Sequence, residues 1–216
     1  DVIFILNKSL LVIMAKWHGF GRCKTRLSKD IGKVNSAKVQ NIMTEHTISV
    51  AKSLEKKGLI EICLAISGLG LKNSKKWSSK LGIQNFNLQG RGCLGEKMKR
   101  QILINKKFCV LKKIKNIIFI GTDLPDLCHL DILNTTEELK QNDLILGPSN
   151  DGGYWIIAFS EKILSNHLNL PFINIKWSEE NVLQNTIDNF SSIDLKYKLL
   201  QQKIDVDTID DIEARK

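Results

Sequence analysis

Short apolar runs alternate along this chain with segments of helical periodicity, and this alternation limits the possible folds more than any other feature. Short apolar runs bounded by turn residues are typical of buried strands, whereas apolar residues spaced three and four apart indicate helices. Strands that alternate with helices predict βαβ units and an α/β protein with a mainly parallel sheet. The expected strands are Leu10–Ala15, Ile60–Ile66, Gln84–Leu88, Ile117–Gly121, Asp143–Leu146 and Tyr154–Ala158, and the expected helices are Asn35–Lys57, Leu94–Lys107, His129–Gln141 and Glu179–Asn189, the last capped by Ser178.

The composition is that of an ordinary globular protein, and it narrows the possible partners. A length of 216 residues favours a single domain over residues 1–216, in which segment 68–80 is the nearest thing to a variable polar excursion. The formal net charge of +9 favours anionic partners such as nucleotides. Basic and aromatic residues are not interleaved, so we expect no nucleic acid partner.

The cysteines and the hydropathy pattern indicate the cellular location of the protein. Five cysteines, an odd number without C-x-x-C spacing, argue against a zinc site or a disulfide framework and favour a reducing, cytoplasmic location. Cys63 and Cys109 lie in or beside apolar runs and are expected in the core. No uninterrupted apolar stretch reaches the roughly 18 residues of a membrane span, so none is expected.

The loop after the first expected strand is rich in basic residues. It reads K-W-H-G-F-G-R-C-K-T-R-L over residues 16–27, so Arg22, Lys24 and Arg26 follow two glycines. Backbone N–H groups and cationic side chains in such a loop can surround a diphosphate, and ligands of parallel sheets bind at this end of the strands. The glycine spacing matches neither a Walker A loop nor a dinucleotide-binding fingerprint. The alternative is a solvated basic surface loop.

Two further segments are rich in glycine. Residues 89–98 read Q-G-R-G-C-L-G-E-K-M and allow either close approach to a ligand or only a flexible connection. Residues 145–158 read I-L-G-P-S-N-D-G-G-Y-W-I-I-A, which predicts two strands joined by a tight loop. In that loop Asp151, Gly152 and Gly153 present a carboxylate and bare backbone, either to a ligand or merely as an ordinary hairpin turn.

Carboxylates follow two other segments that we expect to be extended. Asp123 comes two residues after a buried strand, where a Mg²⁺ or Mn²⁺ ligand would be expected, whereas Asp126 is placed to cap the next helix. Asp205 and Asp207 lie on one side of an extended segment, and the alternative for that segment is a helix N-cap by Asp207 or Thr208.

Five motifs in order carry a more specific resemblance: A-K-x-x-x-x-G-R-x-K-T-R-L, G-x-G-x-L-G-E-K-M, G-T-D-L-P-D-L, G-P-x-x-D-G-G-Y-W and D-V-D-T-x-D-D-I. From about residue 10 to residue 215 the chain resembles the glycosyltransferase-A-like family known as radical-SAM/selenodomain-associated transferases, some of which are named arsenosugar biosynthesis glycosyltransferases. It is similar at greater distance to 2-phospholactate guanylyltransferase and to the molybdenum-cofactor nucleotidyltransferases. The resemblance implies a three-layer α/β/α sandwich with a mainly parallel mixed sheet, the nucleotide-diphospho-sugar transferase fold.

The resemblance also implies roles for individual residues. Asp151 is the candidate catalytic residue, by position only. The chain departs from the family at residues 17–21, where W-H-G-F-G replaces A-P-V-P-G and implies a less stiff loop, and at Cys93, where the family has aspartate. By this resemblance the nucleotide would contact Lys16, Gly21, Arg22, Lys24, Arg26, Gln89 and Gly95, the acceptor would contact Gly152, Gly153 and Tyr154, and Asp123, Asp207 and Asp205 would hold Mg²⁺ or Mn²⁺.

Three functions remain open at this point. The leading one is metal-dependent transfer of a sugar from a nucleoside diphosphate sugar to a small acceptor. The second is nucleotidyl transfer, in which an NTP is attacked and pyrophosphate is released. The third is a catalytically idle nucleotide- or nucleic-acid-binding module, which only the charge of +9 favours. The sequence leaves the nucleobase, the sugar, the acceptor and the oligomeric state undetermined.

Overall fold

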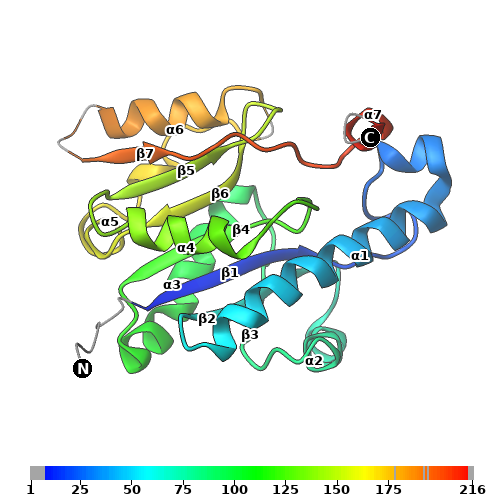
Figure 1. The fold of residues 1–216 in the computed structure, drawn as a ribbon, viewed down its shortest axis with the longest axis horizontal. Helices are drawn as coiled ribbons and strands as arrows, with labels where there is room; N and C mark the ends of the chain where they lie inside the picture. The colour runs from blue at the N-terminus through cyan, green and yellow to red at the C-terminus, as the bar shows by residue number, and fades with distance from the viewer. Residues whose placement is uncertain (1–7, 178, 192, 194, 214–216) are drawn as a thin grey trace.

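The computed structural model describes residues 8–177, 179–191, 193 and 195–213. In these residues seven strands form one sheet in the order β3-β2-β1-β4-β6-β5-β7 (Figure 1). Only β6 runs antiparallel to its neighbours β4 and β5, so the sheet is mixed and mainly parallel, as the sequence predicted. The strands are β1 (Ser9–Lys16), β2 (Ile60–Ser67), β3 (Phe86–Leu88), β4 (Asn116–Ile120), β5 (Leu144–Pro148), β6 (Tyr154–Phe159) and β7 (Tyr197–Leu199).

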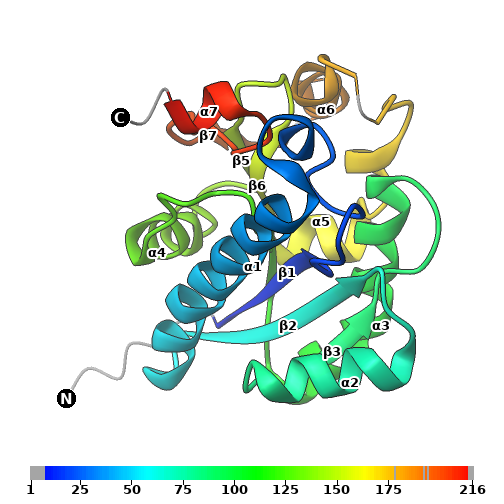
Figure 2. The same cartoon turned by 90° about the vertical axis from the view of Figure 1, so that its right-hand side faces the viewer.

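Helices cover both faces of the sheet. The helices are α1 (Leu27–Lys56), α2 (Leu71–Lys80), α3 (Leu94–Lys112), α4 (His129–Glu138), α5 (Glu161–Asn166), α6 (Val182–Ser191) and α7 (Ile209–Glu213), with a 3-10 turn at Leu170–Phe172. Figure 2 shows α1 and α4 on one side of the sheet and α3 on the other. Among the described helices, none is both long and apolar enough to cross a membrane.

Alternating side chains of the strands build the two cores that hold these layers together. In β1, Leu11 and Ile13 pack with α1, α2 and α4, whereas Leu10 and Val12 pack with α3, α5 and α6. This period of two is what a strand buried on both faces requires. The expected α/β/α sandwich is therefore confirmed, and Cys63 and Cys109 are buried in it as expected.

Some sequence-based expectations were wrong about local structure. Residues 68–80 are more than a polar excursion, because α2 forms there and buries Trp77 together with Ser74 and Ser78. The N-cap of α4 is Cys128 rather than Asp126. The expectation that Ser178 caps a helix falls outside the described residues.

Other differences concern where elements begin and end. Helix α1 starts at Leu27 rather than at Asn35, with a break in its helical geometry at Gly32 (φ 81°, ψ 161°). Helix α6 starts at Val182, and α5 and β7 had no sequence signal strong enough to be expected. The predicted cap of the last helix is confirmed, since the Thr208 hydroxyl accepts a hydrogen bond from the Asp211 N–H at 3.4 Å.

Candidate active site

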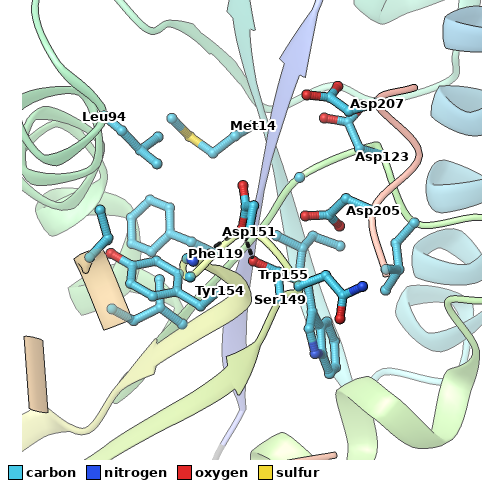
Figure 3. A pocket seen from close by; sticks show the side chains of 18 of the residues that line it. Met14, Leu94, Phe119, Asp123, Ser149, Asp151, Tyr154, Trp155, Asp205 and Asp207 are labelled. Carbon is cyan, nitrogen blue, oxygen red and sulfur yellow. Dashed lines mark hydrogen bonds between the residues drawn. The ribbon is translucent and has the colours of Figure 1, made fainter. Parts of the chain in front are cut away.

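An open cavity of about 860 Å³ lies at the carboxyl ends of β1, β4 and β5, the edge of the sheet where the sequence placed the site. Figure 3 shows three carboxylates, those of Asp123, Asp205 and Asp207, gathered on one side of this cavity. The side chains of Met14, Leu94 and Phe119 lie on the other side, with Asp151 between the two groups. The cavity thus has one acidic wall and one apolar wall.

The acidic wall forms because the segment before α7 runs beside the loop after β4. The Val206 N–H donates a hydrogen bond to the Asp123 carbonyl oxygen at 2.9 Å. This contact brings Asp205 and Asp207, on either side of Val206, next to Asp123. The three residues that the resemblance assigned to a metal are therefore neighbours in space.

Lys24 lies between two of these carboxylates. Its Nζ is 2.7 Å from Asp123 Oδ1 and 3.1 Å from Asp207 Oδ1, and it donates a hydrogen bond to the Val206 carbonyl oxygen. The Lys24 side chain is only 2% exposed. Burial alone would lower the pKa of Lys24, but the ion pairs with Asp123 and Asp207 outweigh burial and raise it above the ordinary value.

As these side chains stand, they do not fit a divalent ion. Carboxylate oxygens are the right ligands for Mg²⁺ or Mn²⁺, but the Lys24 ammonium occupies the space between Asp123 and Asp207. Within the described part of the chain, no group of three or more His, Cys, Asp or Glu side chains is arranged to hold a metal ion. Metal binding by Asp123, Asp205 and Asp207 remains a prediction from the resemblance.

Asp205, an aspartate of the cavity, has a carboxyl group whose pKa is shifted by its surroundings. Burial, together with the negative charges of Asp123 and Asp151, raises its pKa to about 7, and the positive charge of Lys24 offsets only part of this rise. A carboxyl group with this pKa is partly protonated near neutral pH. Asp205 is thus close enough to the other three aspartates of the cavity to be affected by their charges.

The segment around Asp151 is the predicted hairpin, since β5 and β6 pair antiparallel on either side of it. Asp151 Oδ1 accepts hydrogen bonds from the Ser149 hydroxyl and, at 3.0 Å, from the Gly153 N–H. One carboxylate oxygen therefore holds the turn, as in an ordinary hairpin. The same carboxylate also lines the cavity near its middle, so contact with a ligand remains a prediction beside the observed turn (Figure 3).

Gly152 is required at its position for two reasons. Its φ is +81°, and a Cβ there would lie 1.8 Å from the Glu180 carbonyl oxygen. The Gly152 carbonyl oxygen accepts a hydrogen bond from the Leu183 N–H at 2.9 Å, which holds the start of α6 against the hairpin. The sequence predicted that the backbone of Gly152 would lie close to a ligand. In the structure it lies close to Glu180 and Leu183 of the same chain. Tyr154, also assigned to the acceptor, lines the cavity and packs into the core under α3 and α6.

The residues assigned to the nucleotide fall into two groups. Lys16 and Arg22 are exposed, and Gly21 has the positive φ (+70°) that its turn requires. Arg26 is the only residue assigned to the nucleotide that lines the cavity in the described part of the chain. Its Nη1 lies 3.8 Å from Asp207 Oδ2. Nucleotide contacts by Lys16, Gly21, Arg22, Lys24 and Arg26 remain predictions.

Two other assigned residues have packing roles in the structure. The buried Gln89 amide donates to the carbonyl oxygens of Ala15 (3.2 Å) and Ala65 (2.9 Å) and so joins the ends of β1 and β2. A Cβ at Gly95 would lie 2.3 Å from the Trp177 ring, so this glycine makes room for that ring. Nucleotide binding by Gln89 and Gly95 is not needed to explain why these residue types are present.

Sequence reasoning found Tyr154 but missed three other aromatic residues at or near the site, Trp17, His18 and Trp177. Trp177 lines the cavity, and no motif marked it. Trp17 and His18, which replace small residues of the family motif, pack with Trp77 of α2, with ring centroids 4.1 Å (Trp17–His18) and 5.0 Å (Trp17–Trp77) apart. The start of the basic loop is therefore anchored by ring packing rather than left loose. The available sequence signal for this packing was the pair Trp17 and His18 directly after an apolar strand.

Comparisons with known proteins agree with this fold. Residues 50–179 match the family described as "Uncharacterized protein conserved in bacteria (DUF2064)", so the chain belongs to that family. A search of curated proteins found no match.

Among solved structures, a protein from Desulfovibrio desulfuricans G20, provisionally named a nucleotide-diphospho-sugar transferase, is 25% identical, with a TM-score of 0.80 over 96% of this chain and 85% of that one. A 4-diphosphocytidyl-2C-methyl-D-erythritol synthase from Anaerococcus prevotii DSM 20548 is 14% identical, with a TM-score of 0.59 over 96% of both chains. A CMP:2-keto-3-deoxy-manno-octonic acid synthetase in complex with CTP is 13% identical, with a TM-score of 0.58 over 96% of both chains. The fold is therefore that of nucleotide-diphospho-sugar transferases and nucleotidyltransferases.

Proposed function

We propose that this member of the DUF2064 family is an enzyme that transfers a sugar from a nucleoside diphosphate sugar to a small acceptor. The observation that carries the proposal is Arg26, which belongs to the basic loop and also lines the two-walled cavity. A donor whose diphosphate lies on that loop would extend its sugar into the cavity. The similarity to the Desulfovibrio protein supports the same reaction class.

Within this proposal the basic loop binds the diphosphate. Arg22 and Arg26 are exposed and carry guanidinium groups, which bind phosphate oxygens through paired charge-assisted hydrogen bonds. Negative charge grows on the diphosphate as the bond to the sugar breaks. Cations already in place stabilise that charge without rearrangement, so the same two arginines would favour bond cleavage.

The cavity then receives the acceptor. Asp151 lies near its middle, so its carboxylate is placed to take a proton from an acceptor hydroxyl as that oxygen attacks the sugar (Figure 3). The backbone of Gly152 and Gly153 and the ring of Tyr154 form the adjoining surface. The apolar wall of Met14, Leu94 and Phe119 favours an acceptor that carries an apolar part beside the attacking group.

The motif resemblance adds finer detail to the proposal. It groups the chain with radical-SAM/selenodomain-associated transferases, including those named for arsenosugar biosynthesis, and it assigns Mg²⁺ or Mn²⁺ to Asp123, Asp205 and Asp207. We keep the metal requirement as part of the proposal. No step above depends on it, because Lys24 fills the space between Asp123 and Asp207 in the free protein.

Nucleotidyl transfer is the second candidate. The observation in its favour is the fold itself, which this chain shares with two cytidylyl-transferring synthetases. The same arginines would bind the triphosphate of an NTP. The acceptor in the cavity would then attack the α-phosphorus, and pyrophosphate would leave.

The reaction products separate the two candidates. A thermal-shift panel of nucleotides and nucleotide sugars, with and without Mn²⁺, identifies the donor, and ³¹P NMR of the reaction with that donor then follows its phosphorus atoms. Sugar transfer releases a nucleoside diphosphate, whereas nucleotidyl transfer releases pyrophosphate. If no nucleotide binds and polynucleotides bind with a steep salt dependence, both proposals fail and the idle binding module is correct.

A further inference from the structure

Four large apolar side chains lie exposed on one face of α3. They are Leu103, Ile104, Val110 and Leu111, which are 53%, 48%, 72% and 79% exposed. Leu103 and Val110 are two helical turns apart, and so are Ile104 and Leu111, so all four project to the same side of the helix. Single apolar residues are common on a protein surface, but four on one helix face form a patch that points to a partner. We refer to these four residues as the α3 patch.

The α3 patch is separate from the core and from the active-site cavity. The opposite face of α3 packs on the sheet through Met98, Ile102 and Cys109, which are buried. Figure 2 shows α3 covering the face of the sheet opposite α1 and α4. The cavity is lined by the start of the helix, at Leu94 and Met98, rather than by the patch. The patch therefore serves neither the core nor the proposed reaction.

Positive charge borders the α3 patch. Of the 19 residues of α3, six are basic and one is acidic. The exposed Lys107 lies one turn from Leu103 and one turn from Leu111 on the same face. The exposed Lys106 lies one turn before Val110. A partner that fits this surface must offer apolar groups and negative charge together.

We propose that the α3 patch and its lysines bind the surface of a membrane that contains anionic lipids. A helix at such a surface buries apolar side chains at the boundary between headgroups and acyl chains, and lysines beside them reach the anionic headgroups. The long stems of Lys106 and Lys107 can lie along the apolar side chains while their ammonium groups stay among the headgroups. This inference goes beyond the proposed function and does not depend on it.

The charge and shape of this surface favour a membrane over another protein. In a two-fold symmetric dimer through α3, the same lysines would lie on both sides of the contact, and like charges would oppose association. A protein partner gains most from pockets that receive a few anchoring side chains, whereas the α3 patch projects from a single helix. A bilayer accepts such projecting side chains without matched pockets. The net charge of +9 also draws the whole protein toward a negatively charged surface.

Cosedimentation with vesicles tests the proposal. The wild type should bind vesicles of phosphatidylglycerol and phosphatidylcholine at least about tenfold more tightly than vesicles of phosphatidylcholine alone, and added salt should weaken this binding. Leu103→Ser/Leu111→Ser should lower the affinity for the anionic vesicles by at least about tenfold, because it removes apolar area that the bilayer would bury. Lys106→Gln/Lys107→Gln should lower it by about tenfold or more.

Matched double variants on α1, on the other side of the sheet, are the controls. Val34→Ser/Ile42→Ser replaces two apolar residues that are 51% and 64% exposed. Lys29→Gln/Lys38→Gln replaces two exposed lysines. Both controls should leave vesicle binding unchanged, because the changed residues lie on the face of the protein turned away from the membrane.

Several results would overturn the proposal. It fails if the wild type does not bind the anionic vesicles, if the α3 variants bind as the wild type does, or if the α1 controls lose as much affinity. Val110→Asp, a single change at an exposed position, provides the same test if Leu103→Ser/Leu111→Ser does not fold. Sedimentation velocity without lipid examines the other occupant: a wild-type dimer that dissociates in Leu103→Ser/Leu111→Ser would assign the patch to a second copy of the chain and overturn the proposal.

Discussion

Replacing Asp205 with asparagine should stabilise the protein, and only at neutral and alkaline pH. Burial and the charges of Asp123 and Asp151 raise the pKa of Asp205 to about 7, compared with about 3.9 in an unfolded chain. When the pKa of a carboxyl group is higher in the folded state than in the unfolded state, the fold is more stable below the unfolded pKa than it is at high pH. This extra stability is lost as the pH rises through about 7. Above that pH the ionised Asp205 disfavours the folded state, whereas an asparagine stays neutral at every pH.

The magnitude follows from the two pKa values. A rise from about 3.9 to about 7 corresponds to roughly 4 kcal/mol in the free energy of unfolding, at 1.36 kcal/mol for each pKa unit. The cavity is open to solvent, which screens the charges, so we expect about half of this value. Asp205→Asn should therefore raise the free energy of unfolding by about 2 kcal/mol near pH 8, and by much less near pH 4.5.

Urea denaturation of both proteins at the two pH values measures this effect. Asp188→Asn on α6, an exposed aspartate, is the matched control and should give the same small difference at both pH values. A gain in Asp205→Asn that does not change with pH would mean that the effect is not electrostatic. A loss of stability near pH 8 would refute the reasoning, because it would show that the ionised carboxylate makes favourable contacts.

Three further variants test the hairpin and the basic loop. Gly152→Ala should destabilise the protein by about 1–3 kcal/mol in thermal or urea unfolding, because the new Cβ meets the Glu180 carbonyl at a positive φ, whereas Gly121→Ala has open space and should cost little. Asp151→Asn should keep the turn and the nucleotide affinity but lower turnover by about 10²-fold, and full turnover would leave Asp151 as a turn residue only. Arg22→Ala should weaken nucleoside diphosphate binding in calorimetry by about 1–3 kcal/mol and leave nucleoside binding unchanged, and equal weakening of both would assign the loop a structural role.

Most of the sheet could be predicted because its strands are buried on both faces. Such strands form continuous apolar runs, as in Ile60–Ser67 and Asn116–Ile120, and these runs stand out between polar helices. Helix α2 could not be predicted in the same way. It packs against the sheet through one tryptophan and two serines, Trp77, Ser74 and Ser78, so an apolar stripe is missing from its sequence.

The acidic wall was partly predictable. The rule that ligands bind at the carboxyl ends of parallel strands selected Asp123, and the glycines beside Asp151 selected that residue. The acidic pattern near the end of the sequence marked Asp205 and Asp207, and the motif resemblance added their metal role. The orientation of Lys24 could not be predicted. It depends on the segment before α7 running beside β4, through the contact between Val206 and Asp123, and no local pattern encodes that pairing.

The departure from the family motif at residues 17–21 changes how the basic loop is held. The proline-containing motif would stiffen this loop through restricted φ angles, and its loss at residues 17–21 predicted a looser loop. In the structure Trp17 and His18 pack with Trp77 at one end of the loop, and Lys24 is bound to the acidic wall at the other. Arg22 therefore projects from a short segment fixed at both ends. Packing and an ion pair thus replace the stiffness of proline.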